Sequence, residues 1–372
     1  MESSGISLWN IKHTIRNDMD NNISLRFSAI DPVLVKDIPE PIEKEYGSNN
    51  YVYWGGDNAY PQFLFDLSQN CAVLSSIVQG IVDYVKGNNV TSTIMTQEEA
   101  EDLIEKTASD YAIFGLFYWQ IIRNLGGKVQ KIVWLDARYV RTDKDGNLFY
   151  YSENFGKRYG RTNNAIVYPK YNPDRLDPES VICIKTPNSR GVYASPMWSG
   201  AIRDAVIQTK IETFHLNELN NNFMGSAVIS FNNGQPTDSQ KKEIEKNVFE
   251  KFGGAENAAR FLLIFNDSKD NATTVERLTT DDLPDRYENL AKRTREQLFI
   301  AFRATPSLFG LATADNAFNN EEYEQSFKLF NRTVIRPIQT KITSTLAKLY
   351  NSTDVMVIEP FSIENNNEEN VQ

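Results

Sequence analysis

Three aspartates lie within five positions of one another and form a candidate metal site. Asp281, Asp282 and Asp285 could hold Mg²⁺, and a bound Mg²⁺ could promote cleavage of a phosphodiester bond. The same aspartates lie at the start of a helix that we expect to begin at Pro284, where the helix dipole favours carboxylates without any ligand. Capping is therefore the simpler interpretation, and a metal-dependent nuclease stays open as an alternative.

The cysteines and histidines add no recognisable catalytic or metal-binding pattern. Cys71 and Cys183 lie in apolar surroundings, which is typical of small buried thiols in a reducing compartment. His13 and His215 are too few and too far apart for a zinc site, and His215 falls inside an expected helix. The sequence also has no CxxC, HExxH, GxSxG or phosphate-binding GxxxxGK(S/T) pattern. We therefore expect a protein that is not an enzyme and has no catalytic residue, metal or cofactor.

The composition predicts a folded, acidic protein. Of the 372 residues, 41% are hydrophobic and 24% are charged, as in ordinary globular proteins. The net charge of −10, from 39 basic and 49 acidic residues, argues against tight nucleic-acid binding, which needs clustered lysine and arginine. It still allows a surface that stays close to DNA without holding it. The longest apolar run, Tyr111–Ile122, is shorter than the ~20 residues of a membrane-spanning helix, and the N-terminus carries no signal peptide, so we expect a cytosolic protein.

The first half of the sequence predicts an α+β fold. Residues 1–56 read as an arm, because they are mixed in character, rich in asparagine and contain prolines. A helix with apolar residues three and four positions apart then ends at Gly87, and a second helix is expected over 96–114. Aromatic and β-branched runs, separated by Gly126-Gly127 and by Asp143–Gly146, predict β-hairpins. The helical stripe is Leu74, Ile77, Val78, Ile81, Val82 and Val85, and strands are expected at 117–124, 128–142, 147–153, 165–172 and 180–186.

Two long helices are expected to bracket a small insert. Ser195 and Pro196 read as the N-cap and first residue of a helix that continues to about Asn221, a length on the order of 40 Å. The insert combines strands with one helix, whose start is marked by the capping-box pair Thr237 and Gln240. The expected strands of the insert are 226–233, 260–266 and 273–279.

The second long helix, from Pro284, divides into an apolar and a charged face. At 100° per residue, one face carries Tyr287, Leu290, Thr294, Leu298 and Ala301. The opposite face is charged, and ordinary solvation with weak ion pairs is its simpler interpretation. Phe299 also falls on the charged side, which makes it a candidate contact with another subunit. The candidate contact set is Lys292, Arg295, Glu296, Phe299 and Arg303, with Glu288 on the same face.

A loop of small, nearly uncharged residues, 305–319, joins this helix to a final long one. Pro337 is expected to kink the final helix near Thr333, whose carbonyl loses its hydrogen-bond donor. The remaining residues, 351–372, read as a polar, acidic tail that is partly disordered. The apolar stripe of the final helix is Phe327, Phe330, Val334, Ile338, Ile342, Leu346 and Leu349.

The order of these elements resembles the portal protein family of tailed bacteriophages and related prophages, over roughly residues 57–350. The stretch "GVYASP" (Gly191 to Pro196) resembles the Gly-x-x-x-Ser-Pro start of that family's first stem helix. "NNNFMGSAVISFNNGQPTDSQKKEIEKNVFEKFGGAENAARFLLI" resembles the clip, and "LAKRTREQLFIAFRATPSLFGL" resembles the second stem helix with its Pro-x-Leu-x-Gly element. "NNEEYEQSFKLFNRTVIRPIQTKI" resembles the opening of the long wing helix. Two features depart from the family pattern: Ala304-Thr305-Pro306 replaces a common Val-Pro-Pro, and almost no crown follows Tyr350.

The resemblance implies an α+β, portal-type subunit that assembles into a closed ring, typically of twelve copies, at one vertex of a capsid. Such a ring is a conduit for double-stranded DNA, without sequence specificity, during packaging and ejection. Its implied partners are terminase, the major capsid protein and head-completion or adaptor proteins, with no membrane, and its place is the virion after assembly in the bacterial cytoplasm. The implied parts are an N-terminal arm (1–56), an α+β wing (57–194), a first stem helix (195–222), an α/β clip (223–281), a second, antiparallel stem helix (282–304), a tunnel loop (305–319), a long kinked wing helix (320–350) and a short C-terminal tail (351–372).

In such a ring the tunnel loop would project into the channel, where DNA must slide without being held. Small neutral side chains and the repelling Asp315 suit that role, because each neutralised phosphate would add affinity. A merely flexible connection stays open for the loop, as does another non-enzymatic coat or adaptor subunit for the whole protein. The DNA-facing candidates are Ala312, Thr313, Ala314, Asp315, Asn316 and Ala317; the candidates that face partner proteins from the clip are Lys241, Lys242 and Glu243, for which ordinary solvation is equally open.

Overall fold

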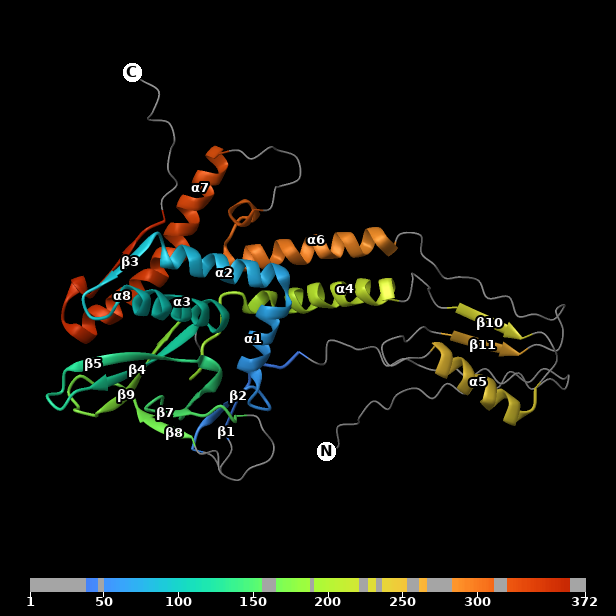
Figure 1. Ribbon diagram of the computed structural model, residues 1–372, viewed down its shortest axis with the longest axis horizontal. Coiled ribbons are helices and arrows are strands. Elements are labelled where there is room, and N and C mark those ends of the chain that lie inside the picture. Colours follow the sequence, from blue (N-terminus) through green and yellow to red (C-terminus); the bar gives the residue numbers. More distant parts are fainter. Residues whose placement is uncertain are drawn as a thin grey trace, which may run out of the picture. The chain divides into compact units, whose positions relative to one another are not determined.

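The computed structural model describes residues 38–45, 50–155, 165–187, 191–220, 227–231, 236–252, 261–265, 283–310 and 320–361 (Figure 1). The chain divides into two units, Met1–Ile38 and Pro39–Gln372, and the description below concerns the second. The helices are α1 (Tyr60–Asn70), α2 (Ala72–Lys86), α3 (Gln97–Phe114), α4 (Ile202–Asn220), α5 (Asp238–Phe252), α6 (Leu283–Phe302), α7 (Asn320–Phe330) and α8 (Arg336–Tyr350). The strands are β1 (Glu43–Glu45), β2 (Val52–Trp54), β3 (Asn89–Ser92), β4 (Leu116–Arg123), β5 (Val129–Leu135), β6 (Val140–Thr142), β7 (Leu148–Tyr151), β8 (Ile166–Pro169), β9 (Glu179–Lys185), β10 (Ala227–Phe231), β11 (Phe261–Phe265) and β12 (Met356–Glu359).

Helices α2 and α3 form where their apolar spacing predicts them. The six apolar residues of the α2 stripe are all buried, and the helix ends at Gly87, whose φ of 72° a side chain would disfavour. Thr96 caps α3: its hydroxyl accepts from the amide of Glu99, and the Glu99 carboxylate accepts from the amide of Thr96. Gly115 ends α3 in the left-handed conformation.

A three-stranded antiparallel sheet, in the order β5-β4-β9, packs against α3 (Figure 1). The Gly126-Gly127 hairpin joins β4 to β5 as predicted. Two tryptophans fix the sheet to the helix: Trp119 donates to the Thr107 hydroxyl at 2.9 Å, and Trp134 donates to the Asp110 carboxylate at 2.9 Å. Asp110 is 5% exposed, and burial, followed by the nearby charge of Asp136, raises its pKa well above the usual range.

A second antiparallel sheet, in the order β6-β7-β8, holds the most buried cation that the structure describes. The predicted turn at Asp143–Gly146 joins β6 to β7. Arg141 on β6 is 1% exposed and donates to the Asn58 side chain at 2.5 Å and to the Asn58 carbonyl at 2.7 Å. It also donates to the carbonyls of Arg138 and Val140. Buried carbonyl oxygens, rather than a carboxylate, therefore satisfy this guanidinium.

Helices α4 and α6 lie side by side and antiparallel (Figure 1). Near the middle of the pair, the buried Thr294 hydroxyl donates to Gln208 at 2.8 Å. Further along α4, Phe214 stacks on Tyr287, with ring centroids 4.8 Å apart. Gln208 precedes Phe214 on α4, whereas Thr294, the partner of Gln208, follows Tyr287 on α6. The two helices therefore run antiparallel. A pair of long helices flanking the insert was the sequence expectation.

The predicted start of the first long helix was wrong. We expected the helix from Ser195-Pro196, but a 3-10 helix covers Ser199–Ala201 and α4 begins only at Ile202. Trp198 explains the delay, because its buried indole donates to the Ala112 carbonyl at 3.1 Å and the chain reaches it through a turn. The Ser195 carbonyl is held separately, by the Thr186 hydroxyl at 3.1 Å.

The described part of the insert is a β-α-β unit. Strands β10 and β11 pair in parallel, which requires a crossover, and α5 is that crossover. At the start of α5, the Gln240 side-chain oxygen accepts from the Thr237 amide at 3.0 Å, one half of the predicted capping box. The third expected strand, 273–279, lies outside the described residues.

The final helix is interrupted where Pro337 predicts, but by a different device. Residues Asn331–Ile335 form a π-helix between α7 and α8, with the Arg336 amide donating to the Asn331 carbonyl. Pro337 has no amide hydrogen for the Thr333 carbonyl, and the wider turn accommodates that loss. Strand β12, which pairs antiparallel with β3 beyond the end of α8, was not predicted. Among the described helices, none is long and apolar enough to cross a membrane.

Candidate functional site

The segment that follows α6 is held by a group of packed aromatic rings, called here the aromatic cluster: Tyr84, Phe299, Phe309, Phe327, Phe330 and Phe361. After α6, Pro306–Phe309 forms a 3-10 helix that ends at Gly310. The Phe309 ring lies 5.7 Å from Phe299 and 6.0 Å from Phe330, centroid to centroid. The Tyr84 hydroxyl donates to the Leu308 carbonyl at 3.2 Å. Burial raises the pKa of Tyr84, so this hydroxyl keeps its proton and remains a donor.

The same cluster holds the chain that follows the loop. Phe327 on α7 lies 5.6 Å from Tyr84, and Phe361, beyond β12, lies 5.4 Å from Tyr84 and 5.8 Å from Phe327. Residues 311–319 themselves lie outside the described part of the chain. Both neighbouring segments, Pro306–Phe309 and α7, are therefore tied to one residue of α2.

Gly80 makes room for the aromatic cluster. It lies in the interior of α2, where glycine is a poor helix former. A Cβ at this position would lie 2.4 Å from one ring carbon of Phe309 and 2.9 Å from another. Only a residue without a side chain lets the Phe309 ring come this close to the helix, which explains a glycine in the interior of α2.

Helix α6 ends in a Schellman motif whose left-handed residue is Arg303. The Ala304 amide donates to the Phe299 carbonyl at 2.9 Å, and the Arg303 amide donates to the Ile300 carbonyl at 3.0 Å. Arg303 has a φ of 55° and its side chain is exposed. The motif turns the chain from α6 toward Pro306.

The charged face of α6 is exposed, but Phe299 is not part of it. Phe299 is 3% exposed and packs on Phe309 of its own chain. The expectation of an open Phe299 was wrong, because the helix-wheel argument could not include a segment that folds back over the end of the helix. The other residues of the predicted contact set are exposed on α6 or at its end: Lys292, Arg295, Glu296 and Arg303, together with Glu288.

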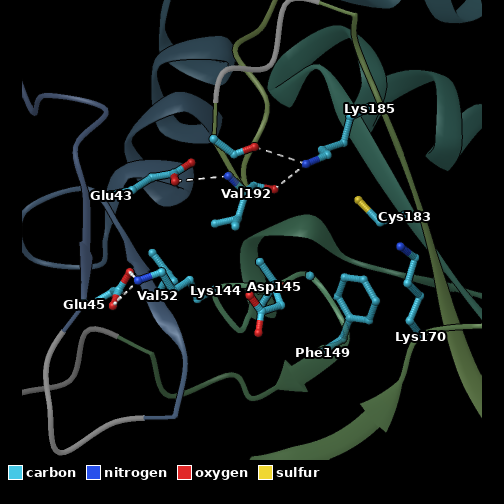
Figure 2. Close-up of a pocket in the computed structure, with 13 residues that line it drawn as sticks. Glu43, Glu45, Val52, Lys144, Asp145, Phe149, Lys170, Cys183, Lys185 and Val192 are labelled. Carbon is cyan, nitrogen blue, oxygen red and sulfur yellow. Dashed lines mark hydrogen bonds and ion pairs between the residues drawn. The ribbon is translucent and has the colours of Figure 1, made fainter.

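The Gly191–Pro196 stretch is held by side chains from distant parts of the chain (Figure 2). The Glu43 carboxylate accepts from the amides of Val192 at 3.1 Å and Tyr193 at 2.9 Å. A Cβ on Gly191 would lie 2.2 Å from that carboxylate, so a side chain at this position would displace the Glu43 carboxylate. Lys185 donates to the carbonyls of Gly191 and Val192 at 3.2 and 2.8 Å. Glu43 on β1 thus binds the amides of this segment, and Lys185 on β9 binds its carbonyls.

Tyr193 fixes the same segment to the core. Its ring stacks on Trp54 at 4.5 Å and 5°, and its hydroxyl donates to the Val52 carbonyl at 2.5 Å. The Thr142 amide donates to the same hydroxyl at 3.2 Å. This anchoring places the chain that leads into Trp198 and α4.

A cavity of about 610 Å³ lies beside this segment (Figure 2). Lys144 of its wall is paired with Glu45 at 3.2 Å, and Lys185 is engaged with carbonyl groups. Burial raises the pKa of the Cys183 thiol, also in the wall, to about 12, so it is not a thiolate nucleophile at neutral pH.

The remaining predicted residues are placed as follows. On α5, Lys242 and Glu243 are exposed and Lys241 is partly exposed. Asp285 lies in the first turn of α6, whereas Asp281 and Asp282 lie outside the described residues. Within the described ranges, no group of three or more His, Cys, Asp or Glu could hold a metal ion. The six loop residues Ala312, Thr313, Ala314, Asp315, Asn316 and Ala317 also lie outside the described ranges.

Sequence reasoning missed several residues that position these segments. Gly80 had a visible signal, since a glycine inside a helical stripe is expected to have a packing reason. Glu43 and Tyr84 had none, because their partners, Val192 and Leu308, are more than a hundred residues away in the sequence.

Comparisons with known proteins give one matching family and several similar structures. The family model described as "Phage portal protein" matches residues 95–364. A chain of a native gene transfer agent virion has 14% identity and a TM-score of 0.52, with 80% of this chain and 83% of that chain covered. A neck chain of a native gene transfer agent particle, computed with C12 symmetry, has 14% identity and a TM-score of 0.50, with 80% and 84% covered. An HK97 family phage portal protein from Corynebacterium diphtheriae has 13% identity and a TM-score of 0.48, with 78% and 92% covered. No curated protein sequence matched the chain.

Proposed function

This chain belongs to the phage portal protein family, and from that premise we propose that it forms a ring at one vertex of a capsid, through which double-stranded DNA enters and leaves. The single observation that carries the proposal is the family match over residues 95–364. Proteins of this family are structural components of the particle, so the role is a conduit and a docking point rather than catalysis. One structure that shares the fold is a particle neck with C12 symmetry. We therefore propose that the ring has twelve subunits.

The element order supports assigning the parts of such a subunit. The wing comprises 57–194, with 320–350 as its long helix, and the arm and tail are 1–56 and 351–372. Helices α4 and α6, within 195–222 and 282–304, are the stem, since they pair antiparallel and flank the β-α-β unit. That unit, within 223–281, is the clip, and residues 305–319 are the tunnel loop.

The exposed charges on the clip and stem support a division of partners. Lys241, Lys242 and Glu243 on α5 face terminase during packaging and head-completion or adaptor proteins afterwards. The charged face of α6 contacts the neighbouring subunit. The wing contacts the major capsid protein, and the assembled ring resides in the virion after forming in the bacterial cytoplasm.

The tunnel loop meets the DNA in this proposal. Its residues are small, and Asp315 repels phosphates, so DNA can slide past without being held. The aromatic cluster supports this role, because it ties both neighbouring segments of the loop to α2. A loop whose two neighbouring segments are both tied to α2 can reach a defined distance into the channel.

Asp315→Lys tests the loop. We expect slower packaging of DNA into procapsids, because twelve added cations would bind phosphates as the DNA passes. Asp174→Lys is the matched control, since it makes the same charge change at an exposed position of the loop between β8 and β9. Equal packaging rates for Asp315→Lys and the wild type would show that the loop does not touch DNA.

Negative-stain imaging of the assembled protein tests the ring itself. Rings with a central hole are the expected result. Shell fragments would instead indicate a coat or adaptor subunit, and metal-dependent cleavage of DNA by a monomer would indicate a nuclease at Asp281, Asp282 and Asp285. Either result would overturn the portal assignment.

A further inference from the structure

Arg303 occupies a backbone conformation that, in the described part of the chain, is otherwise adopted by glycine or asparagine. The helix ends at Gly115, Gly310 and Asn351 have φ values of 75°, 76° and 53°, and Arg303 has 55°. A residue with a Cβ carries a cost of about 1–2 kcal/mol in this region, and only Gly, Asn and Asp adopt it readily. The end of α6 would therefore be more stable with glycine.

Among the described residues, none makes use of the Arg303 side chain. The two hydrogen bonds that end α6 come from the backbone amides of Arg303 and Ala304, and a glycine would donate the first equally well. The side chain is exposed and forms no ion pair or hydrogen bond with the described side chains of its own chain. A strained residue whose side chain the subunit does not need indicates a contact outside the subunit.

The surface around Arg303 favours a protein partner over DNA. Ile300, one turn earlier, is 65% exposed, and an exposed isoleucine beside an arginine is typical of a protein interface. The same face of α6 carries exposed charges of both signs: the carboxylates of Glu288 and Glu296 and the cations of Lys292 and Arg295. Phosphates would be repelled by these carboxylates, whereas a protein surface with charges of both signs can match them.

A second copy of this chain is the partner that the charges fit. The chain has 49 acidic against 39 basic residues, so a neighbouring copy presents carboxylates more often than cations. We propose that the Arg303 guanidinium binds a carboxylate of the adjacent subunit, with Ile300 as the apolar part of the same contact. The proposal rests on the ring described above, and it adds that Arg303 is retained for assembly at the expense of subunit stability.

Replacing Arg303 should therefore move two measurements in opposite directions. For Arg303→Gly, we expect the melting temperature of the unassembled full-length subunit to rise by about 2 °C, because the left-handed strain is relieved. We expect the ring to dissociate about tenfold more readily, measured by size-exclusion chromatography and negative-stain counting. Arg303→Lys keeps the charge and the strain, so it should retain most of the assembly without the rise in melting temperature.

Asn351→Gly is the control for the backbone effect. Asn351 has the same left-handed role at the end of α8, so its glycine variant tests whether relief of strain alone weakens rings. Rings of Asn351→Gly should be as stable as those of the wild type.

The outcomes separate this inference from the proposed function. If the wild type forms rings and the Arg303→Gly rings are equally stable, the Arg303 contact is overturned while the proposed function stands. Normal Arg303→Gly rings that package DNA poorly would also overturn it, in favour of a DNA contact. A wild-type protein that forms no rings under any assembly condition would overturn the portal function and this inference together.

Discussion

Replacing Gly80 with alanine has two opposing effects on the stability of the folded protein, and the sign of each is known. In the interior of a helix, alanine is favoured over glycine by about 1 kcal/mol. Here the new methyl group would lie 2.4 Å from a ring carbon of Phe309, well inside normal contact distance. The ring must move by roughly 1 Å, and overpacking of this kind costs about 1–3 kcal/mol.

The movement also weakens the rest of the aromatic cluster. Phe309 has ring neighbours in Phe299, Phe330 and Tyr84, and each aromatic pair contributes about 0.5–1.5 kcal/mol. Steric cost therefore exceeds helix propensity, and we expect Gly80→Ala to lower the free energy of unfolding by about 1–2 kcal/mol. Because the cluster holds the segment before the proposed tunnel loop, packaging should slow as well.

Urea unfolding of two pairs of variants checks the sign. In a Phe309→Ala background the obstacle is gone, so Gly80→Ala should there stabilise by about 1 kcal/mol. Gly200→Ala is the control, since a Cβ at Gly200 meets nothing within 4 Å, and its effect should be near zero or stabilising. The reasoning fails if Gly80→Ala stabilises the protein equally in both backgrounds.

Three further substitutions probe contacts inside the subunit. Thr294→Val should destabilise by about 1 kcal/mol in urea unfolding, because it removes the 2.8 Å bond to Gln208 between α4 and α6; an unchanged midpoint would mean that water replaces the bond. Arg141→Met should cost about 3 kcal/mol, since the carbonyl of Asn58 would lose its donor while buried, and full stability would contradict this. The pKa of Asp110 is raised in the folded state, so the folded state binds the proton more tightly and the wild type loses stability as pH rises above about 4. Asp110→Asn should therefore gain on the wild type from pH 4 upward until the folded pKa is passed, and a constant difference across pH would contradict the assignment.

Local patterns predicted the helices and hairpins well, because their causes are close in sequence. The α2 stripe, the helix expected over 96–114 and the turn at Asp143–Gly146 each depend on residues a few positions apart. Pro337 located the interruption of the final helix, but a missing amide alone does not specify whether a helix bends or widens into a π-turn. The form of the interruption depends on packing on both sides of it.

Contacts between distant segments could not be predicted in the same way. The helix wheel placed Phe299 on an open face, and only the return of Pro306–Phe309 over that face buries it. Glu43 binds the amides of Val192 and Tyr193 across roughly 150 positions, and no spacing rule links them. A single sequence carries no signal for such pairs, since each member alone resembles an ordinary surface residue.

The pairing of β12 with β3 affects how the acidic C-terminus should be truncated. Met356–Glu359 forms the only described neighbour of β3, and Phe361 packs on Tyr84 and Phe327. A stop codon placed just after Tyr350, at the end of α8, would leave β3 without its described partner strand and remove one ring from the aromatic cluster. Deletions meant to reveal what the terminal glutamates do should therefore begin after Phe361; any shorter product would report the loss of these contacts instead.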